Sequence, residues 1–159
     1  MDKNKEFYIR EALTDDIKEL SENLRQADIN EITALGSNPL MGLLESFLYS
    51  EECYTVIIDG QISGMFGISH VNQPDGFAQI WFLGSDLTTK LPRKWIKEGR
   101  YYINQFLNKY AYLVNIVSTE NILHIKWLER MGAVFSEPLE INNHLFKQFF
   151  ITRIQEEKE

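Results

Sequence analysis

The spacing of apolar positions predicts short strands and amphipathic helices along this chain. Residues 7–10 fit a strand, and the next segment has an apolar residue at every third or fourth position, as one face of a helix does. Thr14 would cap this helix, whose apolar positions are Ile17, Leu20, Leu24 and Ala27. Asn38-Pro39 is a typical helix start, and the helix after it would bury Leu40, Leu43, Leu44, Phe47 and Leu48. We therefore expect two helices before the main sheet.

The middle of the chain alternates strand-like runs with turn residues. The runs CYTVII and QISGMFGIS flank Asp59-Gly60, whose second residue readily takes a positive φ, so they should pair as a hairpin. FAQIWFLG supplies another strand. YLVNIVS is almost wholly apolar, as expected for a central strand covered on both faces. The closing runs AVFS and LFKQFFIT are also strand-like, with a turn between them at Asn142-Asn143.

Two further helices are expected in the second half of the chain. The segment 92–109 begins with proline and places its apolar residues on one arc at about 100° per residue, with Gly99 allowing close packing on a sheet. A helix over 121–131 follows, and Gly132 is a natural stop. The first of these helices should connect FAQIWFLG to YLVNIVS as a right-handed crossover, which makes the two strands parallel. We expect them to splay at their carboxyl ends and leave a cleft.

The composition fits one globular domain over residues 1–159, with a frayed, charged end at 154–159. Of the 159 residues 44% are hydrophobic, which is enough for one core. No apolar run approaches the roughly 20 residues of a membrane-spanning helix, and the first residues contain no apolar signal core. Cys53 is the single cysteine, which fits a reducing compartment. We expect a soluble, cytoplasmic protein.

The charge balance argues against nucleic acid as the main partner. The chain has 16 basic and 23 acidic residues and a net charge of -7, which disfavours contact with a polyanion. A local basic cluster could still bind a phosphate. No spacing of His, Asp or Glu predicts a metal site.

The segment NILHIKWLERMGAVF, together with the order of elements, resembles the GNAT (Gcn5-related N-acetyltransferase) superfamily. In that superfamily the last core helix commonly begins with Asn, has an aromatic residue near its end and stops at a Gly followed by a strand. The resemblance by element order covers nearly the whole chain, and by motif it covers about residues 84–135. The segments SDLTTKLPRKW and HIKWLERMGAVF are also similar to the GNAT-like internal virion protein of short-tailed phages.

The resemblance implies a fold of the α/β (α+β) class. It should have a mixed, mostly antiparallel central sheet of about six to seven strands, flanked by about four helices, with one splayed parallel pair of strands.

Asn121, His124 and Leu128 share one face of the predicted last helix. The resemblance implies that this face borders the thioester of acetyl-CoA, that Asn121 contacts the cofactor, and that a Tyr often stands where this chain has Leu128. Leucine cannot protonate the departing thiolate, so His124 or water would be the general acid. Alternatively, His124 is a packed side chain with one hydrogen bond, and Asn121 is a helix-start residue beside a Thr119 cap.

The loop after FAQIWFLG departs from the superfamily pattern. Members usually carry Gln/Arg-x-x-Gly-x-Gly/Ala there, because small residues let backbone N–H groups close around a pyrophosphate. The resemblance implies that Leu83 and Gly84 hold the pantetheine arm and that their N–H groups polarise the thioester. This chain has GSDLTTKLPRK, whose candidate phosphate-binding residues are Thr88, Thr89, Lys90, Arg93 and Lys94. The alternative is that the three basic residues are ordinary solvated charges.

Asp28 and Glu31 would lie on one side of a helix, in a region that often lines the acceptor site of GNAT proteins. Asp28 could bind an amine, and Glu31 could act as a catalytic base through water. His70, at the end of QISGMFGIS, could reach the same cleft to bind substrate. Alternatively, the two acids are solvated surface residues and His70 is exposed.

Two functions remain open. One is an N-acetyltransferase that moves an acetyl group from acetyl-CoA to an amine. The other is a non-catalytic GNAT-fold protein that serves as a phage internal virion or morphogenesis factor and binds virion or other phage proteins. The altered loop and Leu128 favour the second, whereas Asn121 and the near-complete core favour the first. The chain would act in the cytoplasm of a bacterial host cell or in the virion.

Overall fold

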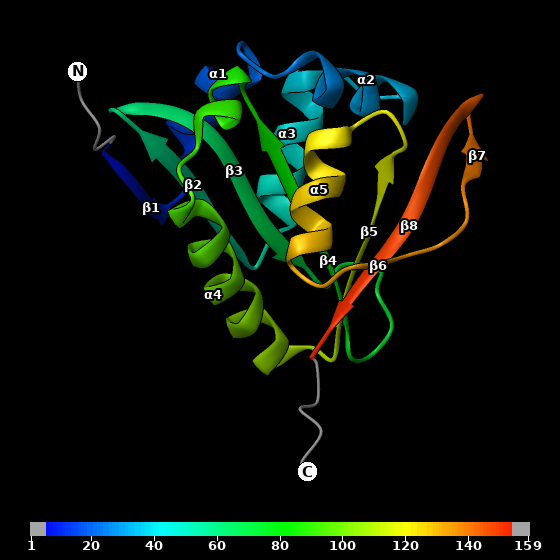
Figure 1. Cartoon of the computed structure of the whole chain (residues 1–159). Coiled ribbons are helices and arrows are strands. Elements are labelled where there is room, and N and C mark those ends of the chain that lie inside the picture. The colour runs from blue at the N-terminus through cyan, green and yellow to red at the C-terminus, as the bar shows by residue number, and fades with distance from the viewer. Residues whose placement is uncertain (1–5, 154–159) are drawn as a thin grey trace.

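The computed structural model describes residues 6–153, which form one sheet with helices on both faces (Figure 1). The frayed end expected at residues 154–159 lies outside the described residues. In the described part the sheet has 8 strands in the order β1-β2-β3-β4-β5-β8-β6, and β7 pairs with β8. The strands are β1 (Phe7–Glu11), β2 (Glu52–Ile58), β3 (Gln61–Ser69), β4 (Phe77–Gly84), β5 (Tyr112–Ser118), β6 (Val134–Phe135), β7 (Leu139–Ile141) and β8 (His144–Thr152). The sheet is mixed and mostly antiparallel, as the sequence predicts.

The helices divide between the two faces of the sheet. One group covers the first face: α1 (Thr14–Ser21), α2 (Gln26–Ala34) and α3 (Pro39–Tyr49). The other group covers the opposite face: α4 (Lys94–Lys109) and α5 (Ile122–Arg130), which stand in front of the sheet in Figure 1. A short 3-10 helix, η1 (Asp86–Lys90), connects β4 to α4. Within residues 6–153 no helix combines the length and the apolarity that crossing a membrane requires.

Strands β4 and β5 form the parallel pair, as predicted. They pair over three residues, Phe77–Gln79 against Tyr112–Val114. The Asn115 side chain then donates to the Ile80 carbonyl at 2.7 Å, beyond the last paired residues. From there the strands run apart toward their carboxyl ends, and this divergence is the predicted splay.

Several local signals act as the sequence predicts. Asn38 caps α3 by accepting a hydrogen bond from the Met41 N–H at 3.0 Å. Asp59 and Gly60 both have positive φ between β2 and β3, and Asn142 and Asn143 do so between β7 and β8. Gly132, with φ of 92°, follows α5.

The first half of the chain requires corrections. Three helices precede β2, not two, so the described part has five α-helices. In the second half, β7 is a strand that the sequence does not predict. The helix expected to run through Ala27 breaks, because Leu24 forms an antiparallel bridge with Ser85. Thr14 is the first residue of α1 rather than its cap, and Asp16 accepts the Leu13 N–H at 2.8 Å instead.

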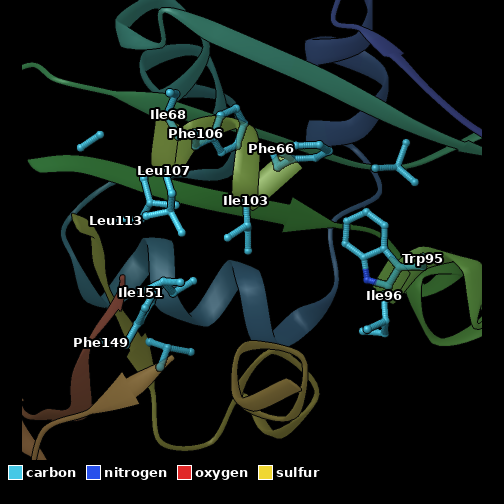
Figure 2. Close-up of a cluster of buried hydrophobic side chains, with 13 residues drawn as sticks. Phe66, Ile68, Trp95, Ile96, Ile103, Phe106, Leu107, Leu113, Phe149 and Ile151 are labelled. Atoms are coloured by element: carbon cyan, nitrogen blue, oxygen red, sulfur yellow. The ribbon is translucent and has the colours of Figure 1, made fainter. Parts of the chain in front are cut away.

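The larger apolar core lies between the sheet and helices α4 and α5 (Figure 2). Its side chains include Phe66, Ile68, Trp95, Ile103, Phe106, Leu113, Phe149 and Ile151. Gly99 allows a close approach, as predicted, but the neighbour is Met131 and not the sheet. A Cβ at Gly99 would lie 2.5 Å from the Met131 Cε. A second core beneath α1, α2 and α3 contains Leu20, Ile32, Leu43, Met65 and Leu83.

Candidate functional site

The diverging ends of β4 and β5 leave a cavity of about 630 Å³. Residues of α2 and α3, such as Glu31 and Tyr49, line it on one face of the sheet. Residues of α4 and α5, such as Trp95 and Trp127, line it on the other face. The cavity therefore crosses the sheet at the splay, where a cleft is predicted.

The Asp28 carboxylate lies against the end of β4. Asp28 is fully buried, and its Oδ2 accepts a hydrogen bond from the Gly84 N–H at 2.8 Å. The Arg25 N–H donates to the Gly84 carbonyl, also at 2.8 Å. Both backbone polar groups of Gly84 are thus bound by the start of α2. The donor that the resemblance assigns to a thioester already holds a carboxylate.

Glu31 and Asn121 connect this carboxylate to β5 and α5. Glu31 Oε2 accepts hydrogen bonds from the Ser118 N–H at 2.8 Å and from Asn121 Nδ2 at 3.1 Å. Asn121 Nδ2 also lies 3.3 Å from Asp28 Oδ1. Asn121 is the residue before α5, but its side chain makes no capping bond. Its role is therefore to hold the two carboxylates, not to cap the helix.

Arg25 brings the positive charge of the site. Its Nη1 lies 3.1 Å from Asp28 Oδ1 and 3.1 Å from His124 Nε2, and its Nη2 donates to Asn121 Oδ1 at 3.3 Å. A guanidinium can only donate, so the contact with Arg25 favours the tautomer in which His124 Nε2 is unprotonated. Because a proton on Nε2 would meet the Arg25 donor, this geometry keeps His124 neutral. We call Arg25, Asp28, Glu31, Asn121 and His124 the Asp28 cluster.

Burial shifts the pKa values of the three titratable groups that accompany Arg25. Desolvation raises the pKa of Asp28 to about 7, against the opposing effects of the Gly84 N–H and Arg25. Burial also raises the pKa of Glu31. Burial, assisted by the charge of Arg25, lowers the pKa of His124 to about 3. At neutral pH Asp28 is therefore partly protonated, the raised pKa of Glu31 acts in the same direction, and His124 is uncharged.

Aromatic rings enclose the other side of His124. Its ring stacks on Trp127 at 5.3 Å and meets Phe82 edge-on at 5.3 Å. Trp95 lies 5.4 Å from Phe82 and 5.6 Å from Trp127, and Leu128 packs against the same cluster. Of these residues only His124 can titrate near neutral pH, and its lowered pKa disfavours proton donation there. His124 is packed among aromatic rings, but its ring contacts two polar side chains, Arg25 and Asn121, rather than the one that the packed alternative expects.

The predicted phosphate-binding residues lie on η1 and at the start of α4, outside the Asp28 cluster. The hydroxyls of Thr88 and Thr89 donate to backbone carbonyls at 2.7 and 2.9 Å, three residues earlier in each case. Three basic side chains are exposed: Lys90, Arg93 and Lys94. The hydroxyls are thus already used within the loop, whereas the basic side chains face solvent.

The backbone of this loop is also bonded to itself. Ser85 accepts hydrogen bonds from the Leu87 N–H through its side chain, at 3.2 Å, and from the Thr88 N–H through its carbonyl, at 3.1 Å. The Leu91 N–H donates to the Thr88 carbonyl at 3.3 Å. Thr88 packs so closely that a Cβ at Gly84 would lie 2.4 Å from its methyl group. These N–H groups are therefore not free to close around a pyrophosphate.

His70 lies away from the Asp28 cluster. It follows β3, whereas Gly84 pairs with Gly64 near the start of that strand. The two therefore lie toward opposite ends of β4. His70 Nδ1 is 2.8 Å from the Phe77 carbonyl. The structure does not bring His70 to the acids with which it was expected to share a cleft.

Sequence reasoning identifies four members of the Asp28 cluster and misses Arg25. A signal for it exists, because Arg25 and Asp28 stand three residues apart, the spacing of a helical ion pair. The alternative of a solvated surface for the two acids is wrong, since Asp28 is 0% exposed and Glu31 contacts buried groups.

The residues present do not fit coenzyme A in the arrangement that the resemblance implies. The Gly84 N–H is bound to Asp28, and the N–H groups of Leu87, Thr88 and Leu91 are bound within the loop. A thioester carbonyl at Gly84 would first have to displace a buried carboxylate, whose other partners would then be left unpaired.

Comparison with known proteins gives a relative among phages. Residues 69–139 match a family model described as bacteriophage T7, probable scaffold protein Gp13. The probable scaffold protein gp13 of Escherichia phage T7 is 35% identical over 130 residues, which cover 79% of this chain and 84% of that protein. The chain belongs to the phage T7 Gp13 family. The similarity to a phage protein that the C-terminal half of this Gp13-family chain indicates is thus confirmed.

Solved structures similar to this Gp13-family chain include acetyltransferases of the GNAT fold. AAC(6')-Ib in complex with ribostamycin and coenzyme A has a TM-score of 0.66 at 16% identity, over 92% of this chain and 93% of that one. Spermidine N-acetyltransferase from Vibrio cholerae, in complex with CoA and spermine, has a TM-score of 0.60 at 16% identity, over 92% and 95%. A GNAT-family acetyltransferase from Bacillus anthracis gives 0.62 at 12% identity, over 92% and 94%. At these identities the likeness shows the GNAT fold and nothing about activity.

Proposed function

We propose that this Gp13-family chain is a non-catalytic GNAT-fold protein of phage particle assembly, which acts by binding other virion proteins. The observation that carries the proposal is the hydrogen bond between the Asp28 carboxylate and the Gly84 N–H at 2.8 Å. This bond occupies the N–H donor that would have to bind the carbonyl oxygen of a thioester as that oxygen develops negative charge. The description of the T7 relative as a probable scaffold protein supports the same class of function.

Acetyl transfer from acetyl-CoA to an amine is the competing function. The cavity of about 630 Å³ and the presence of Asn121 at the start of α5 favour it. In that function Glu31 would take the amine proton, and Lys90 and Arg93 would bind phosphate. Glu31, however, already accepts hydrogen bonds from Ser118 and Asn121, and its displacement would leave both donors unpaired. The contacts of the Asp28 cluster therefore support the assembly role over catalysis.

Complementation of a phage that lacks this gene tests the proposal. The double variant Lys90→Ala, Arg93→Ala removes two exposed charges to which the competing function assigns phosphate binding. We expect this variant to restore infectious particles as well as the natural chain does, and the purified chain to acetylate no amine in a broad panel. A matched control is Leu43→Asp, which introduces a charge at a fully buried core position and should abolish complementation by preventing folding.

Two results would contradict the assembly role. One is an acetylated product that forms only with the purified chain and acetyl-CoA. The other is a loss of particles with the double variant that accompanies a loss of acetyl-CoA binding, although its unfolding transition matches that of the natural chain.

A further inference from the structure

Asn115 interrupts an otherwise apolar stretch in the middle of β5. The strand reads YLVNIVS, and two positions on either side of Asn115, on the same face of the strand, stand Leu113 and Val117. Both are buried in the larger apolar core, whereas Asn115 is half-buried. Removing a polar group from water is unfavourable unless its hydrogen bonds are satisfied, so the partners of this amide determine why it is tolerated here.

The Asn115 amide binds one main-chain group on each of the two diverging strands. Its Nδ2 donates to the Ile80 carbonyl of β4 at 2.7 Å. Its Oδ1 accepts a hydrogen bond from the Ile116 N–H of β5, also at 2.7 Å. A carbonyl can only accept and a backbone N–H can only donate, so these two partners fix the orientation of the amide. Gln79 Nε2 lies 3.4 Å from the same Oδ1 and gives it a second donor.

Regular pairing of β4 and β5 would join these same two main-chain groups directly. The parallel pair ends at Gln79 and Val114, so the next step of the register sets Ile80 opposite Asn115. In a parallel ladder, a carbonyl that faces the partner strand accepts from the N–H one position beyond the opposite residue, which here is the Ile116 N–H. The amide of Asn115 therefore stands in the place of the next ladder hydrogen bond and substitutes two side-chain bonds for it.

The cavity of the candidate site begins where this amide is inserted. From β4 and β5 it is lined by residues 79–83 and 115–117, which start at the last paired step or directly after it. In Figure 1 the two strands lie close at their lower ends and run apart toward their arrowheads, with α5 in front of the gap. The position of Asn115 thus coincides with the near end of the cavity.

Side chains also bind main-chain groups at the far end of the gap. Asp28 accepts the N–H of Gly84, the last residue of β4, and Glu31 accepts the N–H of Ser118, the last residue of β5. Three N–H groups along the gap, those of residues 84, 116 and 118, therefore have acceptors within this chain. The strands can remain apart without a ligand to satisfy these groups, so the cavity is preformed.

We infer that Asn115 is the wedge that keeps β4 and β5 apart and thereby sets the near end of the cavity. An apolar side chain at this position would leave the Ile80 carbonyl and the Ile116 N–H without their present partners. Because unpaired polar groups are costly, the direct hydrogen bond between these two groups would form. The ladder would then lengthen by one step, and the cavity would narrow. This inference goes beyond the proposed function and holds whether or not the chain transfers acetyl groups.

NMR scalar couplings across hydrogen bonds test the inference in the full-length chain. In the natural chain we expect a coupling between Asn115 Nδ2 and the Ile80 carbonyl carbon, and no coupling between the Ile116 amide nitrogen and that carbon. In Asn115→Val the coupling between Ile116 and Ile80 should appear. Asn115→Asp is the matched control, because a carboxylate of the same size still accepts from Ile116 but cannot donate to Ile80. In this control the coupling between Ile116 and Ile80 should stay absent.

Circular dichroism and thermal unfolding establish that the variants fold, and Asn115→Ala, with the same expected coupling, replaces Asn115→Val if the valine variant does not. A natural chain without the coupling between Asn115 and Ile80 overturns the inference. A folded Asn115→Val or Asn115→Ala chain in which Ile116 and Ile80 remain uncoupled, and whose crystal structure retains the full splay, overturns it as well. None of these measurements involves acetyl-CoA, so they leave the test of the proposed function unaffected.

Discussion

The Asp28 carboxylate lies 2.8 Å from the backbone nitrogen of Gly84, at the carboxyl end of the strand that borders the splay. Asp28 comes from α2, on one face of the sheet, and its other oxygen meets Arg25 and Asn121. The carboxylate therefore joins α2, β4 and α5 at the point where the resemblance predicts an acyl group. The chain has the GNAT fold, but the ion pair and hydrogen bonds of the Asp28 cluster cross the cleft.

Removal of this carboxylate should destabilise the chain strongly. Asp28→Ala leaves the Gly84 N–H without its acceptor and the Arg25 charge without its buried partner. Breaking a buried ion pair from one side costs about 3 to 5 kcal/mol, so we expect a loss of that size in urea unfolding. Asp86→Ala, at an exposed position of η1, is the control and should change stability by less than about 0.5 kcal/mol. If Asp28→Ala lowered the free energy of unfolding as little as Asp86→Ala does, the Asp28 cluster would not stabilise the fold.

Asp28 and His124 should give opposite pH dependences of stability. The pKa of Asp28 rises from its ordinary 3.8 to about 7, so in this window the native chain holds a proton that the unfolded chain has released. Its contribution to the free energy of unfolding therefore falls as pH rises. The pKa of His124 falls from 6.5 to about 3, so the unfolded chain binds the extra proton, and this contribution falls as pH falls.

The two effects oppose each other between about pH 4 and pH 6.5, so single substitutions should separate them. In Asp28→Asn the histidine effect remains and is partly opposed by Glu31, whose pKa burial also raises, so the free energy of unfolding should fall on acidification by less than about 1.4 kcal/mol per pH unit. In His124→Gln the carboxyl effect remains, with Glu31 adding to it, and stability should fall as pH rises. Urea unfolding at several pH values measures both slopes. Slopes of the same sign in the two variants would contradict the assignment of the buried charges.

Gly84 should tolerate no side chain. Its Cβ would lie 2.4 Å from the Thr88 methyl group and 3.1 Å from the Ser63 carbonyl oxygen. Thr88 is buried and its hydroxyl is bonded to Ser85, so it cannot move aside freely. We expect Gly84→Ala to lower the free energy of unfolding by about 1 to 3 kcal/mol, the range for overpacking. Gly36→Ala is not a suitable control because Gly36 has a positive φ of 87°, whereas Lys97→Ala, at an exposed residue of α4, probes the background effect.

A tyrosine at position 128 should not create an acetyltransferase. Leu128→Tyr would restore a phenol where the resemblance expects one, but the Gly84 N–H would remain bound to Asp28. We expect no acetylated product from this variant with acetyl-CoA and a panel of amines, as assayed by mass spectrometry. Turnover above the level of the natural chain would show that the missing phenol alone had suppressed catalysis.

The sequence predicts the architecture where local signals and periodicity agree. Asn38 before Pro39 marks the start of α3, and the nearly all-apolar YLVNIVS run marks the central strand β5. The prediction is wrong over residues 22–34. The apolar spacing of a helix continues through Leu24, whereas α1 ends at Ser21. There Leu24 pairs with Ser85, more than sixty residues away, and no local pattern reports such a contact.

The candidate site shows a similar division. The helical spacing that sets Asn121 and His124 on one face is read directly from the sequence, and both are buried together. The burial of Asp28 and Glu31 is not predictable in this way, because isolated acids are usually solvated and only Arg25 and Asn121 make their burial favourable. The Gly84 N–H is not free to bind a ligand because Asp28 of α2 accepts its hydrogen bond. The periodicity of a single helix or strand cannot reveal such a contact between two elements.

Titration of the purified chain with acetyl-CoA, by calorimetry and by thermal shift, tests the central claim most directly. The closed Asp28 cluster and the self-bonded loop predict no heat, no shift of the unfolding temperature and no competition by CoA, up to concentrations that saturate an acetyltransferase. Saturable binding that CoA displaces, and that Lys90→Ala with Arg93→Ala weakens by about 1 to 3 kcal/mol, would contradict the claim, because such binding requires an open cleft and free phosphate-binding groups.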